Sequence, residues 1–178
     1  MCVKKILLCT ITFLLLLVMA SCQRAQTKLK PEDITKNISS SFETVANISY
    51  KSLKATARIS QKSPGECTVT FSSPSSLKDM KLNYTSEKLS VSYKGLSFDF
   101  NPQEMPDSAV AGMIVKAFNN AVNSEGIKVK FEDNAFVIEG SMNTSTFYLK
   151  LDSKNSNLLK LEVPSEQLEV EFVNFKLV

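Results

Sequence analysis

Carboxylates are the side chains of this sequence that come closest to an arrangement for acid–base chemistry. Two acids lie on either side of an Asn-Pro pair and three follow near the C-terminus: Asp99, Glu104, Glu166, Glu169 and Glu171. A glycoside hydrolase needs two such groups, and they only have to meet in space. Charged residues in loops and on strand faces are far more often simply hydrated. We therefore expect no catalytic residue and no enzymatic activity.

The chain of 178 residues contains no histidine. Histidine is the usual base for serine and cysteine nucleophiles and the commonest metal ligand. No phosphate-binding loop, dinucleotide fingerprint or Cys-x-x-Cys pair occurs. The 21 basic and 18 acidic residues lack the basic excess of nucleic-acid-binding proteins. The sequence thus predicts no metal, no dissociable cofactor and no nucleic-acid partner.

Cysteine chemistry is equally restricted in the globular part. Cys67 alternates with Val69 and Phe71, which is typical of a half-buried strand. A lone cysteine in such a pattern is more often a small buried hydrophobe than a reactive nucleophile. We expect no disulfide framework and no chemistry at Cys67.

The N-terminus has the layout of an export signal, with two lysines before an uncharged run, residues 6–20. That run is shorter than the about 20 apolar residues of a membrane-spanning helix. The sequence Met-Ala-Ser-Cys, residues 19–22, resembles the lipobox of bacterial lipoproteins, with Met where Leu is usual. The resemblance implies cleavage before Cys22 and a diacylglycerol on its sulfur, with an N-acyl chain such as palmitate as a further modification. An ordinary secreted protein or an N-terminal anchor helix is the alternative.

This resemblance divides the chain into three parts. Residues 1–21 are a lipoprotein signal peptide, residues 22–30 a polar tether, and residues 31–178 one globular domain of ordinary size. The protein is expected outside the cytoplasm, anchored by lipid to the outer face of the cell membrane. In a cell with two membranes, it would lie on the periplasmic side or at the outer membrane.

Two helices are predicted in the domain. The first begins at Pro31 and ends near Asn47, because Ile34, Ile38, Phe42 and Val45 follow at helical spacing. The second follows Pro106-Asp107-Ser108, carries an apolar stripe from Val110 to Val122, and ends before Gly126.

The rest of the domain alternates apolar and polar residues, which predicts about ten short strands. Their apolar positions start at Leu53, Cys67, Met80, Leu89, Leu96, Ile127, Phe136, Phe147, Leu159 and Leu168. Short connections such as Lys94-Gly95 favour antiparallel pairing. A phase change near Phe172 and Val173 indicates a bulge. We expect a mainly β, α+β domain: a strongly curved antiparallel sheet or half-barrel of about ten strands wrapped around two amphipathic helices.

This order of elements resembles the lipoprotein-localisation-factor superfamily, with its LolA/LolB-like half-barrel. The segment from Pro74 to Met80 and the Tyr93-Lys94-Gly95-Leu96 turn support it. The chain looks closest to uncharacterised lipoproteins of Gram-positive bacteria and is similar in layout to the germination lipoprotein GerS, a partner of a cortex amidase. Carriers of the superfamily line their cavity with Trp and use a gating Arg. This chain has no Trp and places Arg58 on a polar strand phase, so no carrier residue is transferred.

The phenylalanines are the remaining candidates for a site. Phe42, Phe98, Phe100, Phe118, Phe131, Phe136 and Phe147 all fall on apolar phases, which predicts core positions. If the sheet and helices leave a cavity, the candidates for a hydrophobic ligand are Phe42, Phe98, Phe100, Phe118 and Phe147. The favoured function is a non-enzymatic module that binds an envelope protein. The alternative is a carrier or sensor of a lipid or of a lipoprotein acyl chain.

Overall fold

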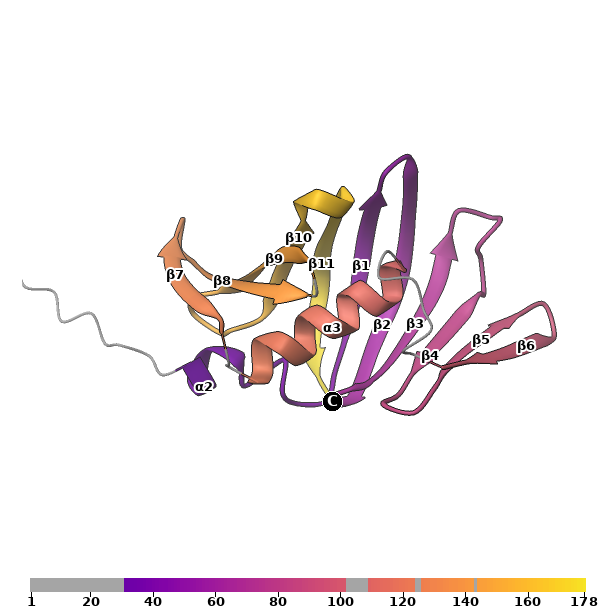
Figure 1. The fold of residues 1–178 in the computed structure, drawn as a ribbon, viewed down its shortest axis with the longest axis horizontal. Coiled ribbons are helices and arrows are strands. Elements are labelled where there is room, and N and C mark those ends of the chain that lie inside the picture. The colour runs from indigo at the N-terminus through magenta and orange to yellow at the C-terminus, as the bar shows by residue number, and fades with distance from the viewer. Residues whose placement is uncertain (1–30, 102–108, 124–125, 143) are drawn as a thin grey trace, which may run out of the picture.

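The computed structural model describes residues 31–101, 109–123, 126–142 and 144–178. Over these residues the chain is mostly β, with eleven strands in one open antiparallel sheet and one long helix, α3, across one face (Figure 1). No helix among the described residues is long and apolar enough to cross a membrane. The strands are β1 (Phe42–Tyr50), β2 (Leu53–Ser63), β3 (Glu66–Ser73), β4 (Lys81–Tyr84), β5 (Leu89–Tyr93), β6 (Leu96–Phe100), β7 (Lys128–Glu132), β8 (Ala135–Met142), β9 (Ser145–Asp152), β10 (Leu158–Val163) and β11 (Leu168–Leu177).

The sheet consists of two meanders joined at their inner strands. The strand order is β6-β5-β4-β3-β2-β1-β11-β10-β9-β8-β7, so the first and last strands are central neighbours. Helix α3 (Val110–Asn123) connects the two outer edges, β6 and β7, and lies diagonally over the sheet between them (Figure 1). A short 3-10 turn, η3 (Pro164–Glu166), joins β10 to β11.

The core lies between α3 and the sheet face beneath it. The helix buries Ile114, Ala117, Phe118 and Ala121, each at most 1% exposed. This confirms the predicted second helix and its apolar stripe, and Gly126 follows it with a φ of +73°. The predicted start of this helix, residues 106–108, lies outside the described residues.

The predicted first helix, Pro31 to about Asn47, is wrong over most of its length. Helix α2 spans only Pro31–Thr35, and strand β1 begins at Phe42. The spacing of Ile34, Ile38 and Phe42 is helical, yet from Phe42 onward alternate residues are buried. Thr44, 2% exposed, belongs to this alternation and donates a hydrogen bond to the backbone carbonyl of Val173. Because Thr44 is a polar residue at a buried position, the apolar–polar alternation of β1 is not visible in the sequence. The Thr44 hydroxyl can be buried because the neighbouring strand accepts its hydrogen bond.

Each of the ten predicted strands has its counterpart among β2 to β11, and β1 is the eleventh. In β10 the predicted Leu161 and Val163 are buried, but at the start of the strand Leu158 (1% exposed) is buried in place of the predicted Leu159 (39% exposed). The pairing with β9 is irregular at this point. The predicted bulge in the last strand is confirmed. The register shifts between Val173 and Lys176, and Phe175 then packs against Phe42 at a ring separation of 5.0 Å.

The opposite face of the sheet is polar, as the alternation predicts. On β9, β10 and β11, Lys160 Nζ lies 2.8 Å from Glu162 and 3.1 Å from Glu169, and Lys150 lies 3.6 Å from Glu162. Glu43 pairs with Lys176 at 3.2 Å across β1 and β11. We call this side the outer face and the α3 side the inner face.

Candidate functional site

The acids singled out from the sequence do not gather into a catalytic site. Asp99, on β6, pairs with Lys88 at 3.3 Å, and hydrogen bonds from Ser90 and Lys88 hold its pKa below the usual value. Glu169 lies on β11, six strands away from β6 in the sheet order. Glu104 lies outside the described residues. No cluster of three or more metal-ligating side chains occurs among the described residues.

Cys67 lies in β3 and is 2% exposed. Burial raises the pKa of its thiol to about 12, so the reactive thiolate is not formed near neutral pH. Its placement agrees with the predicted role as a small core residue. Cys22, the predicted lipid attachment site, and the tether, residues 22–30, lie outside the described residues.

The five candidate phenylalanines form two groups. Phe42, Phe118 and Phe147 are at most 1% exposed and belong to the core. The rings of Phe42 and Phe118 meet edge to face at 5.9 Å, a favourable geometry for aromatic pairs. These three side chains therefore fill part of the space between α3 and the sheet.

Phe98 and Phe100 lie elsewhere, on edge strand β6. They are 55% and 50% exposed, and Leu96 of the same strand is 62% exposed. The predicted core position is wrong for both, and for Phe131 of β7, which is 60% exposed. Alternation identified the apolar face of β6 correctly, but nothing described covers that face.

The exposed residues continue the core face of the sheet. Across neighbouring strands, Ile59, Val69, Leu82, Val91 and Phe98 are successive partners on the inner face. The first two are at most 2% exposed, Leu82 and Val91 are half-buried, and Phe98 is mostly exposed. We call the inner face of β4, β5 and β6 the apolar wing. It comprises Leu82, Tyr84, Leu89, Val91, Tyr93, Leu96, Phe98 and Phe100.

Local structure holds the wing at the end where β5 turns into β6. Lys94 and Gly95, with φ of +50° and +82°, form the two-residue turn that the sequence predicts between β5 and β6. Next to this turn, the Tyr93 hydroxyl donates a 2.7 Å hydrogen bond to the carbonyl oxygen of Ser76. Fully burying one side chain such as Phe98 is worth about 1.5–3 kcal/mol, so a partner that covers the wing gains several times the net energy of one hydrogen bond.

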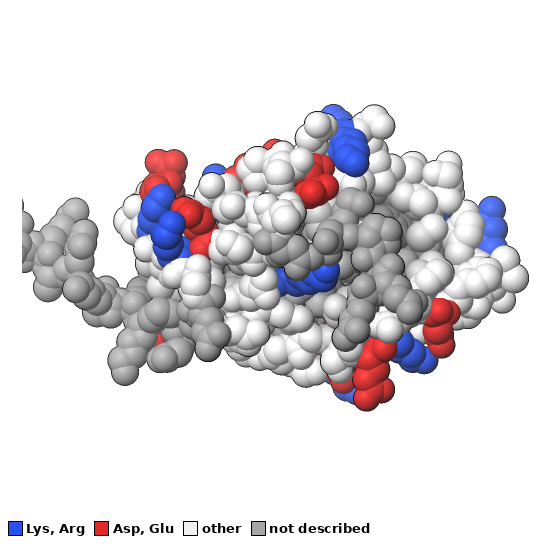
Figure 2. Space-filling model, in the orientation of Figure 1, with Lys and Arg blue, Asp and Glu red and all other residues white. Residues whose placement is uncertain are grey.

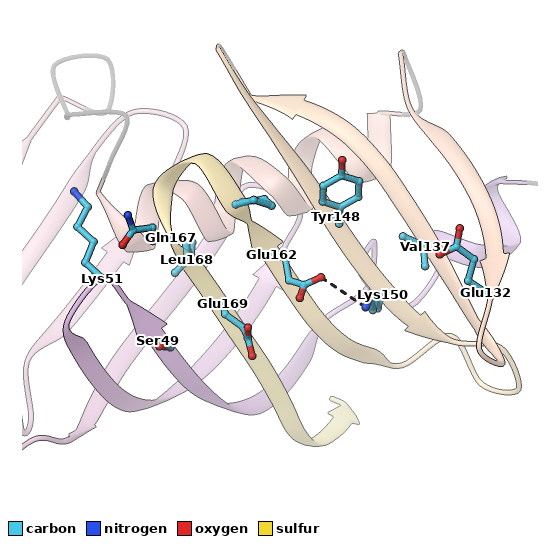
Figure 3. Close-up of a pocket in the computed structure, with 11 residues that line it drawn as sticks. Ser49, Lys51, Glu132, Val137, Tyr148, Lys150, Glu162, Gln167, Leu168 and Glu169 are labelled. Atoms are coloured by element: carbon cyan, nitrogen blue, oxygen red, sulfur yellow. Dashed lines mark ion pairs between the residues drawn. The ribbon is translucent and has the colours of Figure 1, made fainter.

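The outer face carries a groove of about 610 Å³ (Figure 3). Its lining includes Lys51, Tyr148, Lys150, Glu162 and Glu169. The charges in it neutralise one another, because Glu162 pairs with Lys150 and Glu169 pairs with a lysine of β10. No buried side-chain polar atom among the described residues lacks a partner. The groove is therefore a hydrated surface of mixed charge. Its described lining residues contain no buried polar side-chain atom that a ligand would have to pair with.

On the side of the molecule that carries α3, charge does not single out a surface. Figure 2 shows this side, where acidic and basic side chains occur together along the rim. This agrees with the absence of a basic excess in the sequence.

No protein-family model and no curated protein sequence matches this chain. Solved structures do match. An uncharacterised conserved protein from Thermus thermophilus has a TM-score of 0.56 and 13% identity, over 82% of this chain and 83% of that one. One chain in the structure of the Clostridioides difficile CwlD amidase with the GerS lipoprotein has a TM-score of 0.53 and 17% identity, over 88% of this chain and 100% of that one.

A LolA superfamily protein from Nitrosomonas europaea has a TM-score of 0.43 and 10% identity, over 84% of this chain and 94% of that one. The predicted resemblance is confirmed at the level of the fold by the match in the GerS complex. Because every identity is below 25%, the likeness concerns the fold alone.

Proposed function

We propose that this chain is a lipid-anchored envelope lipoprotein whose LolA-like half-barrel binds another protein outside the cytoplasm and catalyses no reaction. The observation that carries the proposal is the apolar wing. A face that begins in the core at Val69 (2% exposed) ends in solvent at Phe98 (55% exposed). A large apolar surface of this kind marks an interaction site on a soluble domain.

Anchoring and location follow from the lipobox-like residues 19–22. Diacylglycerol on Cys22, with or without an N-acyl chain, would hold the domain on the outer face of the membrane. Fully extended, the nine residues 22–30 would separate the start of the domain from the anchor by up to about 30 Å.

A protein partner fits the wing better than an enclosed acyl chain does. Phe42, Phe118 and Phe147 pack in the core, where a carrier would keep a cavity. The β6 part of the wing, Leu96, Phe98 and Phe100, is exposed aromatic and aliphatic surface, which suits an apolar segment of another protein. The structure with a TM-score of 0.53 comes from a complex of an amidase with a lipoprotein, which supports this class of function for the fold.

Site-specific photo-crosslinking in living cells tests the proposal. A benzoylphenylalanine replaces Phe98 in the full chain, and the matched control places it at Lys54, exposed on β2. We expect position 98 to give an adduct that mass spectrometry identifies as a different protein, distinct from a second copy of this chain, and that is weak or missing from position 54. Adducts to lipid alone at position 98 would favour the carrier alternative.

The lipid anchor is tested separately on the same chain. Mass spectrometry of the processed protein should find an N-terminal Cys22 carrying diacylglycerol, and Cys22→Ala should abolish membrane retention. A mature protein that begins at another residue and stays in the membrane would contradict the anchor.

A further inference from the structure

We infer that the outer edge of β6, which pairs with no other described strand, pairs with β6 of a second copy of this chain and so joins two sheets into one. An edge strand exposes a row of unpaired backbone groups, and proteins commonly protect it with charges, prolines or irregularities. The two outer strands of this sheet differ sharply in such protection. Strand β7 reads Lys-Val-Lys-Phe-Glu, with three charges in five residues, whereas β6 reads Leu-Ser-Phe-Asp-Phe.

The β5–β6 hairpin determines which groups of β6 face outward. In a two-residue hairpin the residues that flank the turn, here Tyr93 and Leu96, form a hydrogen-bonded pair, and such pairs alternate along the ladder. The backbone groups of Leu96, Phe98 and Phe100 therefore point toward β5. Those of Ser97 and Asp99 point away from the sheet and can bond with a further strand.

A two-fold pairing must centre on one residue of β6, and the sequence favours Phe98. Ser97 then faces Asp99 of the second copy, both with outward backbone groups, which allows four backbone hydrogen bonds. Leu96 faces Phe100, and the two Phe98 rings are direct neighbours, a favourable cross-strand pair. Centring on Asp99 would instead oppose two carboxylates, which is unfavourable.

This pairing goes beyond the proposed function and does not compete with it. Strand addition uses the edge of β6, whereas the partner proposed above covers the inner face. In the paired form the two apolar wings are continuous, because facing residues of adjacent strands lie on one side of a sheet. The second copy thus doubles the area that a partner can cover.

Disulfide trapping tests the pairing and its register. Ser97→Cys and Asp99→Cys are introduced separately into the full chain, which is solubilised in a non-ionic detergent and oxidised. We expect a 1:1 mixture of the two variants to form crosslinked dimers at least tenfold faster than either variant alone, with wild type as the background. Equal rates in all three samples, or rapid crosslinking of one variant with itself, would overturn the pairing centred on Phe98.

Sedimentation in the same detergent tests the backbone contribution. Ser97→Pro removes an outward N–H without altering the apolar wing, and an edge strand tolerates proline at such a position. We expect its dimerisation constant to fall at least tenfold, while Ser97→Ala, which keeps the N–H, stays near wild type. A Ser97→Pro protein with unchanged circular dichroism and undiminished dimerisation would refute the edge pairing. Photo-crosslinks from position 98 to another protein do not depend on this outcome, so the two proposals fail separately.

Discussion

The ring of Phe147 lies directly over the backbone of Gly140, its cross-strand partner on β8. A Cβ placed on Gly140 would be 2.5 Å from both Cε1 and Cζ of this ring, closer than packed carbon atoms approach. Phe147 is 0% exposed, so the ring has no empty space into which it can move. Gly140 is therefore required by the packing of Phe147, although its own backbone conformation does not demand glycine.

Gly140→Ala should lower the free energy of unfolding by about 1–3 kcal/mol, the usual cost of overpacking a core. Phe147→Leu removes the ring atoms that the new methyl group would meet. The loss caused by Gly140→Ala should therefore be smaller in the Phe147→Leu background. Urea unfolding of the four proteins measures this coupling, and additive losses would show that the contact is not responsible.

Phe98 and Phe118 should respond differently to truncation, although the sequence pattern predicts core positions for both. Phe118→Ala should cost about 3–5 kcal/mol, because its ring is 1% exposed and contacts Phe42 and Phe172. Phe98→Thr should change the free energy of unfolding by about 0.5 kcal/mol or less, since β6 is exposed on both faces. Equal losses in urea unfolding would mean that the apolar wing is covered in the native protein.

The Cys67 thiol should resist alkylation while the domain is folded. Its pKa of about 12 leaves almost no thiolate at pH 8, and its 2% exposure blocks the reagent. Iodoacetamide labelling followed by peptide mass spectrometry should find Cys67 unmodified in buffer and fully modified in concentrated urea. Rapid labelling in buffer would contradict the burial of the Cys67 thiol and would be evidence for a reactive nucleophile.

The cluster around Lys160 should make stability depend on pH at both ends of the scale. The hydrogen bond from Lys160 to Glu162 lowers the pKa of the Glu162 carboxyl group and raises the pKa of the Lys160 ammonium group. The Glu162 contribution is present above its ordinary pKa of 4.5 and is lost as pH falls through the lower folded value. The Lys160 contribution is present below 10.5 and is lost as pH rises through the higher folded value.

Lys160→Met should therefore lower Tm most between these limits, with the difference from wild type shrinking below pH 4.5 and above pH 10.5. Lys54→Met, on the same outer face but outside the cluster, is the control and should show a small difference at every pH. A Lys160→Met difference that is independent of pH would mean that the lysine acts through packing of its alkyl chain.

Most strands could be predicted because one face of each is apolar, and period-two alternation records that face directly. Strand β1 could not, since its buried positions include Thr44 and Ala46, which weaken the alternation, while Ile34, Ile38 and Phe42 happen to fit a helix. The apolar wing was also hidden. The alternation at Phe98 and Phe100 predicts which way the side chains point, but whether α3, the next element in the chain, covers them depends on the path along which it crosses the sheet.

The adjacency of β1 and β11 also sets the order in which the domain can be completed. Phe42 pairs with Leu177, and the Val178 amide donates to the carbonyl of Ser41, so the central seam of the sheet unites the two ends of the domain. Such remote contacts slow folding. If the chain is exported as proposed, β1 crosses the membrane before β11 and stays unpaired on one edge until β11 has followed. Holding the chain unaggregated during this interval is a demand that the topology itself places on the export pathway.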